Sequence, residues 1–120
     1  MTRHHRSWRF VVSGSREVPS YSVECEREVV GHVAAFEQFG AREVSYWIAR
    51  PHWGRGIATQ ALRLFLAELP MRPLHARAAA DNAASIGVLV RCGFVACGAE
   101  RGFAAARGEE IDEVVLRLDA

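Results

Sequence analysis

The sequence has little cysteine, no marked excess of charge of one sign and no long hydrophobic run. Cys25, Cys92 and Cys97 lack the paired spacing of a metal site or a disulfide framework, so we expect no metal and a reducing, cytoplasmic location. A formal net charge of +1 argues against nucleic acid as a partner. The apolar runs are too short to span a membrane, and the basic residues 1–8 lack the apolar segment of a signal peptide.

The chain nevertheless holds enough apolar material for a core. Half of its 120 residues are hydrophobic, and no internal repeat or low-complexity tract divides it. We therefore expect a single domain over residues 1–120. The pattern is least informative over residues 1–20, where a short strand over residues 8–12 is the one expected element.

Residues 45–62 predict a strand, a tight glycine turn and a helix. The aromatic and β-branched run at residues 46–48 is typical of a buried strand, which Pro51 should end because it has no N–H to donate. Gly54 and Gly56 then permit backbone conformations that other residues resist. Apolar residues recur at helical spacing beyond them, at Ala58, Ala61, Leu62, Phe65, Leu66 and Leu69.

This turn is a candidate anion site. The first turn of a helix has unpaired N–H groups and a partial positive charge, and the preceding glycines let a phosphate approach the main chain. The alternative is a plain strand-to-helix turn. The segment is no mononucleotide P-loop, because no Lys-Ser/Thr follows, and Thr59 stands where a dinucleotide fingerprint has its third glycine. Positive side chains close to the turn are Arg50, His52 and Arg55.

The remaining elements define a fold class. Alternating and β-branched residues predict an antiparallel meander over residues 21–25, 29–36 and 42–49. After the helix at about residues 56–69 we expect a strand at 74–79, a helix from Asp81 to Gly93, and strands at 94–103 and 111–118. The strand–helix–strand order implies one parallel pair. The class is therefore α+β, a mixed sheet with helices packed on it.

Two segments resemble the GNAT N-acetyltransferase superfamily. Residues 52–62, HWGRGIATQAL, resemble its acetyl-CoA pyrophosphate loop, which has the pattern Gln/Arg-x-x-Gly-x-Gly/Ala. Together with the Tyr-Trp-Ile just upstream, they are similar to the branch of ribosomal-protein N-terminal acetyltransferases. Residues 81–94, DNAASIGVLVRCGF, are similar to the family's Asn-x-x-Ser/Ala-Ile-x-x-Leu-x-x-x-Gly-Phe segment. Pro51 departs from the pattern, because it stands at the leading Gln/Arg position.

The resemblance implies a fold and a cofactor. The fold is a mostly antiparallel central sheet with a splayed parallel strand pair and flanking helices, covering residues 21–118. The cofactor is acetyl-CoA, with the thioester carbonyl near Ile48 and Ala49, the pantetheine along residues 48–50 and the pyrophosphate on N–H groups of residues 53–58. The residues expected to bind it are Ile48, Ala49, Arg50, Trp53, Gly54, Arg55, Gly56, Ile57, Ala58, Asn82 and Ser85.

Two residues have alternative roles. Asn82 either binds the pantetheine or caps its helix, and capping by Asp81 would leave it to the ligand. Glu43 is the expected catalytic base or water-positioning group, because related sequences often carry glutamate there; its alternative is a solvated charge beside Arg42. Tyr46 and His32 are weaker candidates for the base.

The resemblance also implies an activity, direct transfer of an acetyl group to a primary amine, either a protein N-terminus or a small amine. Many members protonate the departing thiolate with a tyrosine at the position held here by Leu89. About twenty abbreviated residues stand where the family has a strand and two helices, so the acceptor pocket is open, completed by a second subunit in a homodimer, or absent. The alternative functions are a non-catalytic acyl-CoA-binding or sensing domain and a plain interaction protein. No membrane partner is expected.

Overall fold

The computed structural model describes residues 2–4, 8–14, 19–38, 40–54, 56–104 and 107–119. Residues 1–71 and 72–120 each form a compact unit. The expected single domain stays a prediction, and so does the parallel strand pair.

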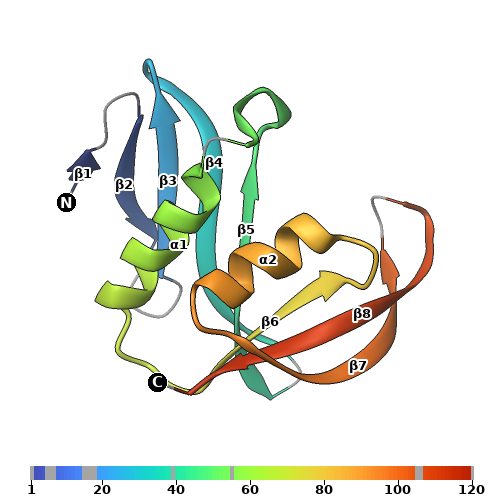
Figure 1. Ribbon diagram of the computed structural model, residues 1–120. Helices are drawn as coiled ribbons and strands as arrows, with labels where there is room; N and C mark the ends of the chain where they lie inside the picture. Colours follow the sequence, from blue (N-terminus) through green and yellow to red (C-terminus); the bar gives the residue numbers. More distant parts are fainter. Residues whose placement is uncertain are drawn as a thin grey trace. The chain divides into compact units, whose positions relative to one another are not determined.

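The first unit is an antiparallel meander whose strands pair in chain order (Figure 1). Its strands are β1 (Thr2–His4), β2 (Trp8–Gly14), β3 (Pro19–Cys25), β4 (Glu28–Gln38) and β5 (Ala41–Ile48). Glu26 and Arg27 both have positive φ, which is the geometry of a two-residue hairpin turn. The predicted three-stranded meander is confirmed. β1 was missed, and β2 is longer than the strand expected over residues 8–12.

Helix α1 (Ile57–Glu68) covers one face of this meander. The ring of Tyr21 on β3 meets the ring of Phe65 edge-on, with centroids 5.2 Å apart, and the Tyr21 hydroxyl donates a hydrogen bond to Glu68. α1 also contacts β4 and β5. Of the predicted apolar stripe, Ala58 is half-buried and the other members are buried: Ala61, Leu62, Phe65, Leu66 and Leu69. Ile57, which the stripe did not include, is buried as well. This packing fixes the start of α1 next to the end of β5.

Gly31 lets β4 and β5 approach closely. It lies opposite Ile48, and a Cβ at Gly31 would come within 2.6 Å of Ile48 Cδ1 and 2.7 Å of the Trp47 carbonyl oxygen. We expect Gly31→Ala to lower the free energy of unfolding by about 1–3 kcal/mol, because the backbone oxygen must move. Urea unfolding measures this loss. Gly98→Ala in β7 is the control, because its Cβ meets nothing within 4 Å, and equal stability of the two variants would contradict the clash.

The second unit is a three-stranded antiparallel sheet with one helix (Figure 1). Its elements are β6 (Leu74–Ala79), α2 (Ala83–Arg91), β7 (Val95–Ala104) and β8 (Glu109–Leu118). β8 lies between β6 and β7, and α2 contacts β6. The buried side chains Leu74, Leu89, Phe94 and Leu116 supply apolar core. The predicted helix, strands and final hairpin are confirmed, and with the first unit they confirm the mixed α+β class.

Across the part of the chain that the structure describes, no helix is long and apolar enough to cross a membrane. Within the same residues, no three or more His, Cys, Asp or Glu side chains are grouped so as to hold a metal ion.

Candidate functional site

The backbone between β5 and α1 is fixed by its own hydrogen bonds. A short 3-10 helix, η1 (Arg50–His52), follows β5, where the sequence predicted only the end of a strand before Pro51 and a tight glycine turn. The Ala49 N–H donates to the Val30 carbonyl at 2.7 Å, which ties the end of β5 to β4. The His52 N–H donates to the Ala49 carbonyl at 2.9 Å. The turn therefore has a defined shape.

The two glycines of the turn have the conformation that their residue type was expected to supply. Gly54 has φ +76° and Gly56 has φ +74°, both in the left-handed region that disfavours side chains. A Cβ at either position would meet nothing within 4 Å, so the space over the main chain is open. The open space is what a ligand needs to approach the backbone. Arg55, between them, lies outside the described residues.

The start of α1 has no side chain that caps its free N–H groups or offsets its partial positive charge. Its N-cap is Gly56, which makes no side-chain cap hydrogen bond, and no acidic residue lies in the first turn. The first helical hydrogen bond is donated by the Gln60 N–H to the Gly56 carbonyl at 3.1 Å. Because the helix end has a partial positive charge and N–H groups pointing outward, this arrangement suits an anion.

The end of β5 presents backbone groups at the edge away from β4. Neighbouring residues of an antiparallel strand alternate in the direction of their N–H and C=O groups. Since Ala49 donates to β4, Ile48 directs its N–H and C=O toward the opposite edge. An extended amide-containing ligand along this edge would find Ile48 as a backbone partner.

Trp53 makes a contact that the sequence did not reveal. Its indole N–H donates to the Ile48 carbonyl at 2.6 Å, and the Arg50 guanidinium carbon lies 5.2 Å from the ring centroid. The side chain is nevertheless 60% exposed. Sequence reasoning assigned only backbone roles to Trp53, because the contact depends on the η1 turn that brings the ring back to the strand.

Glu43 is buried, with 3% of its surface exposed. It lies opposite Phe36 on β4. Helix α1 covers the face of the sheet on which Tyr46 lies. Because side chains alternate along a strand, Glu43 points to the opposite face. The alternative of a solvated charge is therefore wrong. A buried carboxylate in the strand that leads to the candidate anion site is a candidate for proton transfer, and that role stays a prediction. Of the weaker candidates, Tyr46 and His32 are both half-buried.

Asn82 and Ser85 belong to the second unit, whereas the turn belongs to the first. The Asn82 side-chain oxygen accepts a hydrogen bond from the Ser85 N–H at 3.1 Å, so Asn82 caps α2. Asp81 does not cap it, because its carboxylate accepts two hydrogen bonds from Arg107, at 2.8 and 2.9 Å. Contact of Asn82 and Ser85 with a cofactor stays a prediction.

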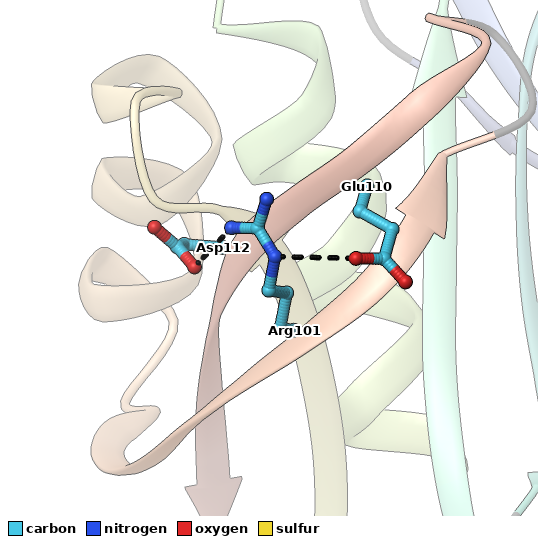
Figure 2. A network of polar contacts seen from close by, with 3 residues as sticks. All are labelled: Arg101, Glu110 and Asp112. Carbon is cyan, nitrogen blue, oxygen red and sulfur yellow. Dashed lines mark hydrogen bonds and ion pairs between the residues drawn. The ribbon is translucent and has the colours of Figure 1, made fainter.

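The hairpin of β7 and β8 carries a network of charged side chains. Figure 2 shows Arg101 donating to Asp112 at 2.9 Å and to Glu110 at 3.4 Å. Hydrogen bonding and charge attraction, chiefly from Asp112, raise the pKa of the Arg101 guanidinium above its ordinary value. An open hollow lies beside this network. Two arginines and four carboxylates surround it and leave it acidic; it is lined by Ala80, Asp81, Arg101, Arg107, Glu109, Glu110, Ile111 and Asp112.

The ion pair of Asp81 and Arg107 predicts a pH effect. The hydrogen bonds from Arg107 hold the pKa of the Asp81 carboxyl below its ordinary value of 3.8. Because the folded-state pKa is lowered, the pair stabilises the fold above the unfolded-state pKa, and that contribution is lost as the pH falls through the folded-state value. We expect Arg107→Gln to return the pKa of Asp81 toward 3.8, as followed by NMR titration. Arg117→Gln is the control, and an unchanged Asp81 pKa in Arg107→Gln would contradict the pairing.

The elements form a mixed α+β protein in which a glycine turn joins the end of strand β5 to the start of helix α1, and the sequence comparison names the family. Residues 2–95 match the family described as the acetyltransferase (GNAT) domain. The chain therefore belongs to the GNAT acetyltransferase family. No curated protein matches the sequence significantly.

Solved structures share this fold. The ribosomal-protein-S5-alanine acetyltransferase from Vibrio fischeri is 20% identical with a TM-score of 0.78, over 86% of this chain and 62% of that chain. The microcin C7 self-immunity acetyltransferase, solved with acetyl-CoA and AMP, is 18% identical with a TM-score of 0.72, over 87% and 62%. A spermidine N-acetyltransferase chimera from Vibrio cholerae and hSSAT is 18% identical with a TM-score of 0.72, over 88% and 69%. The chain thus spans 62% of the length of the first two.

Proposed function

We propose that this chain binds acetyl-CoA at the turn between β5 and α1. The observation that carries the proposal is the start of α1, where Gly56 has φ +74° and supplies no side-chain cap. The pyrophosphate would lie against N–H groups of residues 53–58, and the positive helix end would offset its charge. Arg55 would add a positive charge there. A structural relative was solved with acetyl-CoA, which supports this assignment.

The pantetheine arm would run along Ile48, Ala49 and Arg50. Ile48 offers both a backbone N–H and a C=O at the edge of β5 that faces away from β4. These groups suit the amides of the pantetheine. The same strand end would place a backbone N–H near the thioester carbonyl, where negative charge develops during acyl transfer. Asn82 and Ser85 stay proposed contacts of the same cofactor.

We further propose that the chain transfers the acetyl group to a primary amine. Acetyl-CoA supplies an activated thioester; the amine nitrogen forms an amide as the carbon–sulfur bond breaks. The amine must lose a proton to attack, and Glu43 would accept that proton directly or through one water. Leu89 is buried and has no proton to give, so the departing thiolate would be protonated by Ser85, Cys92 or water, or leave unassisted.

In this proposal the acceptor is a protein N-terminus or a small amine. The protein acts in the cytoplasm. A homodimer is the assembly that would complete an open acceptor pocket. Two structural relatives name such acceptors, a ribosomal-protein alanine and spermidine. Phe103, 69% exposed on β7, and Arg107 are candidates for contacting the acceptor. The second candidate function is a non-catalytic acyl-CoA sensor, which the Pro51 and Leu89 departures favour.

A transfer assay separates these two functions. The full chain is incubated with acetyl-CoA and either an alanine-initiated peptide or spermidine, while thiol release and product mass are followed. All fifteen basic residues other than histidine are arginine, so the chain has no lysine, and its own N-terminus is its one primary amine. Amine-dependent thiol release with an acetylated product supports the enzyme. Saturable acetyl-CoA binding without transfer to any amine supports the sensor.

A further inference from the structure

We propose that Trp53 is a latch on the acyl-CoA site, whose indole holds the Ile48 carbonyl until the cofactor displaces it. The inference rests on the proposed function, because it concerns the strand edge along which the pantetheine would run. Its starting point is the 2.6 Å hydrogen bond from the indole N–H to the Ile48 carbonyl. We call this hydrogen bond the Trp53 latch.

The Trp53 latch occupies the acceptor that the cofactor needs. Alternation along β5 directs the Ile48 N–H and C=O to one edge, away from β4. An amide N–H of the pantetheine lying along that edge requires a carbonyl there. Alternation turns the neighbouring Ala49 carbonyl away from that edge, and it accepts from the His52 N–H. The Arg50 carbonyl likewise accepts from the Trp53 N–H at 3.1 Å. Ile48 is therefore the carbonyl for which indole and cofactor compete.

The surroundings of Trp53 allow the indole to leave. The ring is 60% exposed, so no core packing is lost when it turns away from the strand. Arg50 is exposed as well and sits over the ring at 5.2 Å, so the two side chains can move together. The backbone bonds of η1 do not involve the indole, and the turn keeps its shape when the ring moves. The indole N–H then finds water as its partner.

The latch predicts that removing the indole N–H strengthens cofactor binding. Trp53→Phe keeps an aromatic ring beside Arg50 and removes only the donor. The Ile48 carbonyl is then hydrated, and displacing a loosely held water costs less than breaking an internal hydrogen bond. We expect CoA to bind about fivefold more tightly, the equivalent of one hydrogen bond of ordinary net strength. A residue that merely braced the turn would show the opposite sign, weaker binding after the substitution.

The experiment combines calorimetry with indole NMR on the full chain. CoA is titrated into wild type, Trp53→Phe and the control Trp47→Phe. Trp47 is also exposed, at 52%, but its side chain lies on the other face of β5 from Ile48. Trp47→Phe should therefore leave the affinity for CoA unchanged. The indole signal missing from the Trp53→Phe spectrum identifies Trp53. At saturating CoA we expect that signal to move upfield in the proton dimension and to exchange faster with water.

The outcomes distinguish the latch from the proposed function. Tighter binding by Trp53→Phe with release of the indole signal supports the latch. Binding by wild type with a Trp53 indole still protected, or weaker binding by Trp53→Phe, overturns the latch and leaves the acyl-CoA site standing. Absence of CoA binding by both folded wild type and Trp53→Phe overturns the acyl-CoA site, and the latch with it.

Discussion

Gly56→Glu should weaken acetyl-CoA binding by about a hundredfold or more, the largest effect that the structure predicts for one substitution. Three effects act in the same direction. The residue has φ +74°, a conformation that a side chain disfavours. The new side chain fills the open space over the main chain, and its carboxylate brings negative charge to the helix start expected to hold the pyrophosphate. Calorimetric titration of the variant with acetyl-CoA measures the loss.

The chain offers a matched control for this substitution. Gly40 also has φ +74°, and a Cβ there would likewise meet nothing within 4 Å. It precedes the start of β5, whereas the turn follows the end of that eight-residue strand, roughly 25 Å away. Gly40→Glu therefore adds the same strain and charge far from the site and should keep wild-type affinity. Equal affinities of the two variants would show that the helix start does not hold the cofactor.

Glu43→Gln should lower kcat for acetyl transfer by about a hundredfold while the affinity for acetyl-CoA stays unchanged. The amide keeps the size of the buried side chain but cannot accept a proton from the attacking amine. Steady-state kinetics with an amine acceptor, together with a cofactor titration, separates the two quantities. Since Glu43 is 3% exposed, circular dichroism of the variant should accompany the kinetics to establish that it folds.

Glu37→Gln is the control for Glu43→Gln. Glu37 lies on the neighbouring strand β4, pairs with Arg42 at 3.6 Å and is largely exposed. Losing its charge should leave transfer unaffected, because surface ion pairs contribute little. If Glu43→Gln turned over as fast as Glu37→Gln, Glu43 would have no part in proton transfer, and the base would have to be sought at Tyr46 or His32.

Much of the fold was readable from local sequence signals. α1 begins and ends within one residue of the predicted bounds, because a glycine turn precedes it, Pro70 follows it and its apolar spacing is regular. The meander from β3 to β5 was readable from alternation and short turns. β1 was missed because Thr2–His4 is short and carries no apolar alternation. η1 was missed because Pro51 signals the end of a strand without specifying the turn that follows.

The contacts that complete the candidate site depend on tertiary structure. Glu43 stands beside Arg42 in the sequence, which favours a solvated charge, and only the assembled sheet buries it. Asp81 and Asn82 are equally good caps by residue type. The ion pair of Asp81 with Arg107, twenty-six residues away, settles capping in favour of Asn82. The hydrogen bond from Trp53 to Ile48 arises only once η1 has turned the chain back.

The measurement that tests the central claim most directly is a calorimetric titration of the folded full chain with CoA and with pantetheine, which lacks the pyrophosphate. If the start of α1 holds the pyrophosphate, CoA binds saturably at one site per chain and pantetheine binds about a hundredfold more weakly or worse, because it forgoes the charge-assisted hydrogen bonds. Equal affinities for the two ligands, or no binding of CoA, would contradict the claim.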